Sequence, residues 1–443
     1  MKAANGLSVS VWYTNDTVGD FCFSGTLCMR KSSFAVGLDI GSGMTRVVVA
    51  APGKDHETPR IIGVGMVPSS GVRRGSVVDM DGAVRTILES ISRAEGMASV
   101  HIDRVVVALG GHEVFFRETS GVVAVGKADG EVIEDDVNRV LDQAKNSATL
   151  SPNQDILHII PKHYRLDDEK NIKDPLGMSG VRLEVSALLI GDASQHTKNI
   201  LRALEQANVA LDQFVVAPLA ASEAVLGARE RELGVALVDI GANTTSLAVF
   251  EEGDLLHVKI LPIGSGHITN DIAIGLRTSI DVAEEVKIRY GSALPVDIDQ
   301  QEDIDLSEVN SSEDGMVSRR HVAEIIEART EELFRYVDEE LVSVGRSGLL
   351  PAGIVLTGGG AKLPGLVELA KDTLRLPAKI GYPKPLGGVL DRVDDPEFAT
   401  AIGLILWAEA STDHGSGRSL WVVSPHVRDT VSRARKFLGK FLP

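Results

Sequence analysis

One short pattern occurs once in each half of the sequence, and it constrains the fold more than any other feature. Residues 35–50 and residues 234–250 each contain an apolar strand, an Asp-Ile-Gly tip and a second apolar strand. Glycine lets the backbone approach an anion closely, and successive N–H groups in a tight turn form an anion-binding concavity. The aspartate can hold a cation, or a water of its shell, beside phosphates. A phosphate hairpin repeated in this way predicts two similar lobes that clasp one nucleotide.

Size and composition limit the class of protein. A chain of 443 residues exceeds what one hydrophobic core usually supports, so at least two domains are expected. An apolar content of 44% with only 4% aromatic residues favours an α/β protein with strands rich in valine and isoleucine. The net charge of −17 argues against non-specific nucleic-acid binding. No run of about 18 apolar residues is present, so we expect no membrane-spanning segment.

Hydrophobic periodicity predicts alternating strands and helices along the rest of the chain. Strands are expected at residues 61–65, 105–109, 156–160, 181–190, 214–216, 255–261 and 354–356. Helices are expected after residue 79, at residues 131–144, 195–207, 282–290 and 320–344, and after residues 271 and 364. The segment 297–314 holds eight acidic residues and no basic one, which is typical of a solvated loop.

Two further features are compatible with a nucleotide site. The triplet Gly358-Gly359-Gly360 separates a strand from a helix, so it is either a tight turn or a place where the backbone approaches a flat or anionic group. Combined with the two hairpins, the triplet favours a ligand site. Glu284 and Lys287 lie one helical turn apart on the same face. They are either a surface ion pair or a pair that meets a ribose hydroxyl and a base edge.

The two ends of the chain differ from its centre. Residues 1–33 show no clear period and do not read as a signal peptide. We expect a disordered tail or a mis-assigned start there, since Met29 looks like a natural first residue. Both cysteines, Cys22 and Cys28, lie in this stretch, and they are too few for a disulfide scaffold, which is compatible with a reducing cytosol.

The C-terminal segment 427–443 is basic and amphipathic, and it follows a linker at 411–426 that is rich in Ser, Gly and Asp. It is a membrane-surface helix, a partner-binding helix or a solvated tail. Each base near an anionic leaflet contributes about 1 kcal/mol, so a single helix binds weakly and multivalent display would stabilise attachment. For the membrane alternative the contacting residues are Arg428, Val431, Arg433, Arg435, Lys436, Phe437, Leu438, Lys440, Phe441 and Leu442.

The order of the motifs resembles that of the FtsA family, bacterial cell-division proteins of the actin/Hsp70/hexokinase superfold. The matching stretches are AVGLDIGSG (35–43), VVDM (77–80), ILHIIP (156–161), DPLGMSGVRLE (174–184), VDIGANTTSLAVF (238–250), PIGSGHITNDIA (262–273), AEEVKIRYG (283–291), VLTGGGAKLPG (355–365) and PEFATAIGL (396–404). The resemblance implies an α/β, two-lobed actin-like ATPase fold with a duplicated core and an FtsA-type inserted subdomain.

The resemblance also implies a division into subdomains. After the extension at 1–33, these are 1A at 34–101, an inserted 1C at 102–179, 1A again at 180–230, 2A at 231–264, 2B at 265–335, 2A again at 336–384, a return to 1A at 385–410, the linker at 411–426 and the membrane-targeting helix at 427–443.

By resemblance, ATP and Mg²⁺ are the expected ligands. The residues carried over for the nucleotide are Asp39, Gly41, Ser42 and Gly43 in the first phosphate loop, Asp239, Gly241, Ala242, Asn243 and Thr244 in the second, Glu284 and Lys287 on the adenosine side, and Gly358, Gly359 and Gly360 near adenine. Asp39 and Asp239 are the expected Mg²⁺ residues, through water.

Two departures from the family pattern matter for the chemistry. The second loop has Ala242-Asn243 where many members have glycines, so these side chains crowd a phosphate, although Asn tolerates a left-handed backbone. Ala217 stands before Pro218 where related ATPases carry an acid that positions the attacking water. Glu223 is a weak substitute. We therefore expect ATP binding with at most slow hydrolysis.

The function implied is that of an ATP-binding actin-like cell-division protein. It anchors FtsZ filaments to the cytoplasmic face of the membrane at the division site, as a peripheral protein of the Z-ring and septum. Its expected partners are the FtsZ C-terminal peptide at subdomain 2B, further copies of itself in a filament and an anionic membrane surface, with no nucleic acid. The alternatives are an actin-like adaptor of pilus assembly, or an ATPase or kinase of the actin superfold.

Overall fold

The structure is a computed structural model. It describes residues 34–53, 58–311, 313, 315–388, 393–412 and 422–423, with backbone alone at 411, 412, 422 and 423. The expected extension at 1–33, most of the linker at 411–426 and the whole C-terminal segment 427–443 lie outside the described residues, so these expectations stay predictions.

The first half of the chain builds a six-stranded sheet around the first Asp-Ile-Gly hairpin, in the order β11-β6-β1-β2-β3-β19. β1 and β2 are antiparallel and place Asp39 opposite Arg46, whereas β6 and β11 continue the sheet in parallel. The strands are β1 (Ala35–Ile40), β2 (Met44–Ala51), β3 (Arg60–Pro68), β6 (Arg104–Leu109), β11 (Ala210–Val216) and β19 (Gly387–Gly388). Their valine-rich runs are buried almost throughout, because both faces of the sheet are covered.

The second half repeats this topology in a five-stranded sheet with the order β14-β13-β12-β17-β18. Its antiparallel strands β12, β13 and β14 correspond to β1, β2 and β3, and its parallel strands β17 and β18 correspond to β6 and β11. The strands are β12 (Val235–Ile240), β13 (Thr245–Glu251), β14 (Asp254–Leu261), β17 (Gly353–Thr357) and β18 (Ala378–Ile380). The duplication predicted from the repeated hairpin is therefore confirmed in the strand order.

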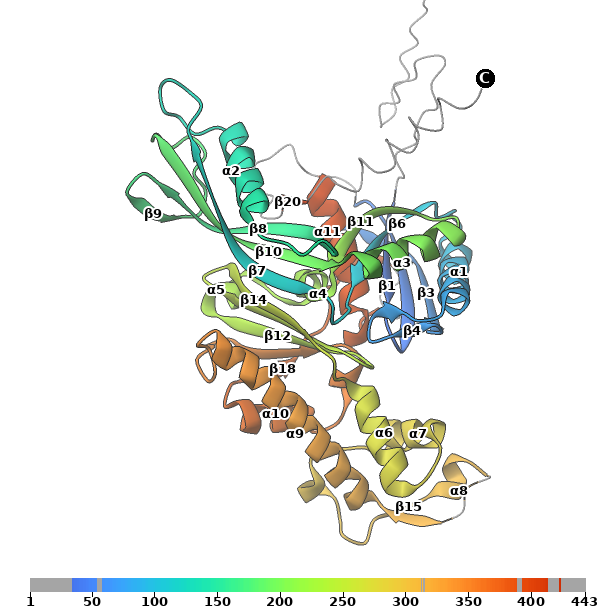
Figure 1. Cartoon of the computed structure of the whole chain (residues 1–443). Helices are drawn as coiled ribbons and strands as arrows, with labels where there is room; N and C mark the ends of the chain where they lie inside the picture. Colours follow the sequence, from blue (N-terminus) through green and yellow to red (C-terminus); the bar gives the residue numbers. More distant parts are fainter. Residues whose placement is uncertain are drawn as a thin grey trace, which may run out of the picture. The chain divides into compact units, whose positions relative to one another are not determined.

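A long helix, α9 (Arg319–Ser343), contributes a large part of the core of the second half. The helix begins where the hydroxyl of Ser318 accepts the N–H of His321, a side-chain cap. Its buried side chains recur at helical spacing; they are Val322, Ala323, Ile326, Thr330, Leu333, Phe334, Val337 and Leu341. Each large apolar side chain in this stripe contributes about 1.5–3 kcal/mol by leaving water. The helix contacts α6 (Ser265–Leu276) and α10 (Leu366–Leu374), beside which it runs in Figure 1.

The other helical segments fall between the strands. They are α1 (Met80–Ala98), α2 (Glu134–Ser147), α3 (Ser194–Gln206), α4 (Ala217–Val225), α5 (Ala228–Leu233), α7 (Ile280–Tyr290), α8 (Leu306–Val309), α11 (Ala399–Thr412) and the 3₁₀ turns η1 (Pro295–Asp297), η2 (Gly359–Lys362) and η4 (Pro396–Phe398). Within the described residues, none of the helices combines the length and the apolar character needed to span a bilayer.

A third sheet forms the inserted part of the first half. It consists of β7 (Phe115–Ala124), β8 (Gln154–Leu166), β9 (Glu169–Ile172), β10 (Arg182–Ala193) and β20 (Val422–Val423). Helix α2 lies along this sheet in Figure 1 and packs with it around a separate apolar core. The strand pairing corrects both bounds of the inserted subdomain expected at 102–179. β6 pairs with β1 and so belongs to the first sheet, whereas β10 pairs with β7 and β8 and so belongs to the inserted sheet.

Local differences from the expectations have physical causes. The predicted helix 131–144 begins only at Glu134, because the Asp136 carboxylate accepts the N–H of Ile133 at 3.1 Å and closes the helix start there. The acidic segment 297–314 is not simply a loop. Its strand β15 (Asp303–Asp305) pairs with β16 (Met316–Ser318), and α8 lies between them. A second short hairpin, β4 (Val72–Arg73) with β5 (Ser76–Val77), precedes α1.

Candidate functional site

A cavity of about 630 Å³ lies where the tips of the two duplicated hairpins meet. Every residue carried over for the nucleotide lines it: Asp39, Gly41, Ser42, Gly43, Asp239, Gly241, Ala242, Asn243, Thr244, Glu284, Lys287, Gly358, Gly359 and Gly360. They come from both halves of the chain, from β1, β12, α7 and the turn after β17. The structure thus brings together residues that the sequence places more than 300 positions apart.

The glycine triplet is needed by the geometry of the second hairpin. Gly358 has a positive φ of 83°, and a Cβ there would lie 2.2 Å from Oδ1 of Asp239. Any side chain at this position would therefore push the aspartate out of place. The N–H of Gly358 donates to the carbonyl of Pro396 at 3.1 Å, which holds the turn against the segment preceding α11. The triplet is both a tight turn and part of the cavity wall.

The two aspartates at the hairpin tips share one electrostatic environment. Burial raises the pKa of Asp39 to about 6, and the charge of Asp239 adds to the rise while Arg46 opposes it. Burial also raises the pKa of Asp239, against a hydrogen bond from the hydroxyl of Thr400 at 3.1 Å and the charge of Arg46. Two carboxylates in this state favour a bound cation between them. Hard oxygen donors of this kind suit Mg²⁺.

Glu284 and Lys287 form the ion pair that the sequence allows, and they line the cavity as well. Lys287 Nζ is 2.6 Å from Glu284 Oε2 and 2.8 Å from the hydroxyl of Thr269. The lysine is buried, whereas the glutamate side chain is 45% exposed at the mouth of the cavity. Oε2 of Glu284 accepts from Lys287 and Thr269, so the pair fixes one wall and Oε1 is the oxygen that could accept from a hydroxyl-bearing ligand.

Sequence reasoning missed several residues of the cavity wall. Arg46 lies opposite Asp39 in the hairpin register, so the strand pairing is a signal that would have found it. Its guanidinium is 2.7 Å from Glu397 and 3.9 Å from Asp39. Glu397 lies in η4 and Thr400 in α11, more than 340 residues after the first hairpin. Both fall in the matching stretch 396–404, but their residue types alone did not indicate a place in the cavity.

The wall offers no carboxylate at the position of Ala217. This alanine lines the cavity at the start of α4, as the departure from the family pattern predicts. Glu223 is not a substitute, since its carboxylate is held 2.8 Å from Arg231 and does not line the cavity. The acids among the described lining residues are Asp39, Asp239, Glu284 and Glu397.

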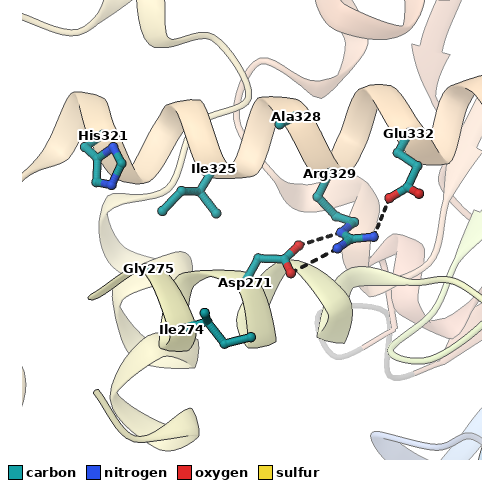
Figure 2. Close-up of a pocket in the computed structure, with 8 residues that line it drawn as sticks. All are labelled: Asp271, Ile274, Gly275, His321, Ile325, Ala328, Arg329 and Glu332. Carbon is teal, nitrogen blue, oxygen red and sulfur yellow. Dashed lines mark hydrogen bonds and ion pairs between the residues drawn. The ribbon is translucent and has the colours of Figure 1, made fainter. Parts of the chain in front are cut away.

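A shallow groove of about 450 Å³ lies between α6 and α9 (Figure 2). Its lining combines apolar and charged side chains: Asp271, Ile274, Gly275, His321, Ile325, Ala328, Arg329 and Glu332. Arg329 bridges the two helices, because it bonds both carboxylate oxygens of Asp271 and also pairs with Glu332. Ile274 is 76% exposed, which is unusual for an isoleucine. An apolar rim beside fixed charges suits a peptide ligand.

Comparisons with known proteins agree on one family. Residues 236–403 match the family model of cell division protein FtsA, and residues 111–191 match the SHS2 domain inserted in FtsA. Cell division protein FtsA of Pseudomonas aeruginosa is 36% identical over 392 residues, which cover 88% of this chain and 93% of that protein. The Bacillus subtilis protein of the same name is 38% identical and covers 86% of this chain and 84% of its own length.

Solved structures agree on the fold. A structure of the PilM-PilN type IV pilus biogenesis complex superposes with a TM-score of 0.60 at 21% identity, covering 84% of this chain and 98% of that one. MreB5 of Spiroplasma citri bound to AMPPNP superposes with a TM-score of 0.51 at 15% identity, covering 87% and 98%. At these identities the likeness concerns the fold alone, which is α/β and actin-like.

Proposed function

Because this chain belongs to the FtsA family of cell division proteins, we propose that it binds ATP with Mg²⁺ in the hairpin cavity and links FtsZ filaments to the membrane. One observation carries the nucleotide part of this proposal. Two copies of one hairpin, from opposite halves of the chain, direct their Asp-Ile-Gly tips and a glycine turn into a single cavity. A solved relative in fold, MreB5 of Spiroplasma citri, has AMPPNP bound.

The proposed roles follow the position of each group. The N–H groups at the two tips cradle the phosphates, and the hydroxyls of Ser42 and Thr244 donate to them. Asp39 and Asp239 hold Mg²⁺ through water, and its positive charge would favour the ionised form that burial disfavours in both carboxyls. Glu284 and Lys287 face the ribose, and the turn at Gly358 to Gly360 faces the adenine. Without an acid at Ala217 to orient water, turnover is slow and ATP acts mainly as a conformational ligand.

The groove between α6 and α9 is the proposed site for the FtsZ C-terminal peptide (Figure 2). It lies within residues 265–335, the region proposed as subdomain 2B. Exposed Ile274 and its neighbour Ile325 offer an apolar anchor, while the paired charges of Asp271, Arg329 and Glu332 line the groove beside it. Such helix-lined grooves bind peptides through a few apolar anchors with charged groups setting orientation.

Membrane attachment is proposed from sequence alone, because residues 427–443 lie outside the described part of the chain. The basic residues and apolar side chains of this segment suit the surface of an anionic leaflet. Self-association into filaments would multiply this weak attachment. We therefore place the protein at the cytoplasmic face of the membrane at the division site.

Two measurements test this function in order. Isothermal titration with ATP, with and without Mg²⁺, tests the cavity, and Asp239→Asn is expected to abolish the Mg²⁺-dependent part of binding.

Co-sedimentation with anionic vesicles then compares the full chain with a chain ending at Ser424. Pelleting that requires residues 425–443 supports attachment through the tail. Equal pelleting of both chains, or of neither, would show that the tail is not an anchor.

A further inference from the structure

The hairpin of β4 and β5 connects the first phosphate loop to a buried histidine. The N–H of Gly75, at the hairpin tip, donates to Oγ of Ser42 at 3.0 Å. The carbonyl of the same Gly75 accepts from Nε2 of His196 on α3 at 2.8 Å. Gly75 has a φ of 79°, and an added Cβ would lie 2.6 Å from the carbonyl oxygen of Gly110. A residue with a side chain would therefore not fit at the tip of this hairpin.

His196 is itself held at one end of the inserted sheet, where β7 begins beside the end of β10. Its Nδ1 is 2.5 Å from a carboxylate oxygen of Asp192, at the end of β10. Glu113, just before β7, lies 3.7 Å from the same nitrogen and accepts the hydroxyl of Ser76 at 2.8 Å. His196 and Asp192 are buried, and Glu113 is half-buried. The β4–β5 hairpin is therefore bonded to Glu113, which precedes β7, and to His196, which follows β10 on α3.

The hydrogen bonds define the charge of His196. A backbone carbonyl only accepts, so Nε2 carries a proton toward Gly75. Nδ1 faces the carboxylate of Asp192, so it carries the second proton, and the ring is an imidazolium. Burial opposes this charge, but the hydrogen bond and charge of Asp192, the carbonyl of Gly75 and the charge of Glu113 outweigh it and raise the pKa of His196.

The same three side chains have the composition of a divalent metal site, but their spacing disfavours that role. Ligand atoms around a tetrahedral zinc ion are separated by about 3.3 Å, given metal–ligand distances near 2.1 Å. Nδ1 of His196 and Oδ2 of Asp192 are 2.5 Å apart, the separation of a short charge-assisted hydrogen bond. This separation fits a shared hydrogen-bond proton and is too short for two ligands of one metal ion.

We propose that His196 is a positioning residue for nucleotide binding, which fixes the first phosphate loop from the base of the inserted sheet. Anchored by Asp192, it holds the carbonyl of Gly75, and the N–H of Gly75 occupies an acceptor lone pair of Ser42 Oγ. The hydroxyl proton of Ser42 is then directed into the cavity, toward a phosphate oxygen. ATP affinity and the seating of the inserted sheet are thereby coupled. This inference rests on the proposed ATP function.

Two isosteric variants separate positioning from stability. In His196→Gln the side-chain amide reaches the place of Nε2 and keeps the bond to Gly75, whereas in His196→Asn it reaches the place of Nδ1 and keeps only Asp192. We expect the Gln variant to bind MgATP within about twofold of the wild type at neutral pH, and the Asn variant to bind up to about tenfold more weakly. Thr197 lies on the same helix as His196, and its hydroxyl donates to Asp155 on β8. Thr197→Val removes this hydrogen bond, serves as the control and should leave MgATP affinity unchanged.

The pH profile supplies a readout that a purely structural role would not move. Since the pKa of His196 is raised, its anchoring is complete below the ordinary histidine pKa and is lost as pH rises through the raised value. Wild-type affinity should therefore fall toward about pH 9 relative to His196→Gln, whose amide does not titrate. Thermal unfolding of each variant shows whether it is folded. If His196→Asn does not fold, the comparison of MgATP affinity against pH for the wild type and His196→Gln still tests the positioning role.

The outcomes are distinct. Equal MgATP affinity in the wild type and His196→Asn, or parallel pH profiles in the wild type and His196→Gln, would overturn the positioning role and leave the ATP function standing. Failure of the wild type to bind ATP at any pH would overturn both.

Discussion

Single residues in the cavity act against the stability of the empty protein. Asp39 and Asp239 are half-buried in the cavity wall, and desolvation raises the pKa of each. A carboxyl whose folded pKa exceeds its unfolded value binds its proton more tightly in the folded state. Its ionisation therefore lowers the free energy of unfolding as pH rises from about 4 to about 6. Such strain is expected where a ligand later supplies the compensating charge.

Asp39→Asn removes the ionisable group, so comparing this variant with the wild type should reveal how much the ionised Asp39 lowers the free energy of unfolding. At about pH 8 the variant without nucleotide is expected to be more stable than the wild type by about 1–2 kcal/mol, after allowance for solvent screening, and the difference should shrink as pH falls from about 6 to about 4 and be absent below that. The same variant should lose the rise in melting temperature that MgATP gives the wild type. Denaturant unfolding at the two pH values measures the first effect. Asp142→Asn, an exposed acid on α2, is the control, and an equal gain there would refute the argument.

At the scale of secondary structure, amphipathic elements were predictable and uniformly buried ones were not. The stripe of α9 was visible in the sequence within a residue or two of its observed ends. Helices α4 and α11 escaped prediction, because they are apolar on all sides and carry no period. Strand β7 was missed because the adjacent charged residues Arg117 and Glu118 interrupt its apolar run and only Gly121 in it is buried. Strand β10 belongs to the inserted sheet because it pairs with β7 and β8, and the local sequence of β10 does not indicate these partners.

The same contrast holds within the cavity. Both Asp-Ile-Gly tips and the glycine triplet are dense local motifs, so the resemblance located them. Glu397 and Thr400 reach the cavity only because α11 returns to the first sheet, which is a property of the chain's path. The link from Ser42 through Gly75 to His196 joins three separate segments by backbone groups, which leave no trace in residue type.

The groove between α6 and α9 gives a prediction for one element. Ile274→Asp replaces a largely exposed isoleucine, so its effect on the free energy of unfolding should be within about 0.5 kcal/mol. Loss of this apolar anchor should weaken binding of a synthetic FtsZ C-terminal peptide by roughly tenfold or more. Fluorescence anisotropy of the labelled peptide measures this. Ile280→Asp on α7 is a matched control, because Ile280 is also exposed but lies outside the groove. Equal losses in the two variants would place the peptide elsewhere.

Across the whole molecule, the proposed activities depend on one another. The cavity takes one nucleotide between the duplicated sheets, the groove is built on α6 and α9, and α6 begins at Ser265, which itself lines the cavity. The N–H of Ser265 donates to the carbonyl of Gly241 in the second hairpin at 2.9 Å. A single hydrogen bond therefore links the second hairpin, which is expected to contact the nucleotide, to helix α6, which carries Ile274. ATP and the FtsZ peptide are expected to influence each other's affinity reciprocally.

The C-terminal segment 427–443 is proposed to convert assembly into membrane attachment, and charge reversal tests this proposal in the full chain. A segment with five bases would gain only about 1 kcal/mol from each base near an anionic leaflet, so an isolated copy should exchange readily and a filament should not. Arg433→Glu with Arg435→Glu should abolish pelleting with anionic vesicles while leaving MgATP affinity and peptide binding unchanged. Wild-type pelleting should rise steeply with protein concentration, require MgATP and fall as salt is added. Pelleting that is linear in concentration and indifferent to nucleotide would mean that each copy binds alone, and the tail would then need no filament to act.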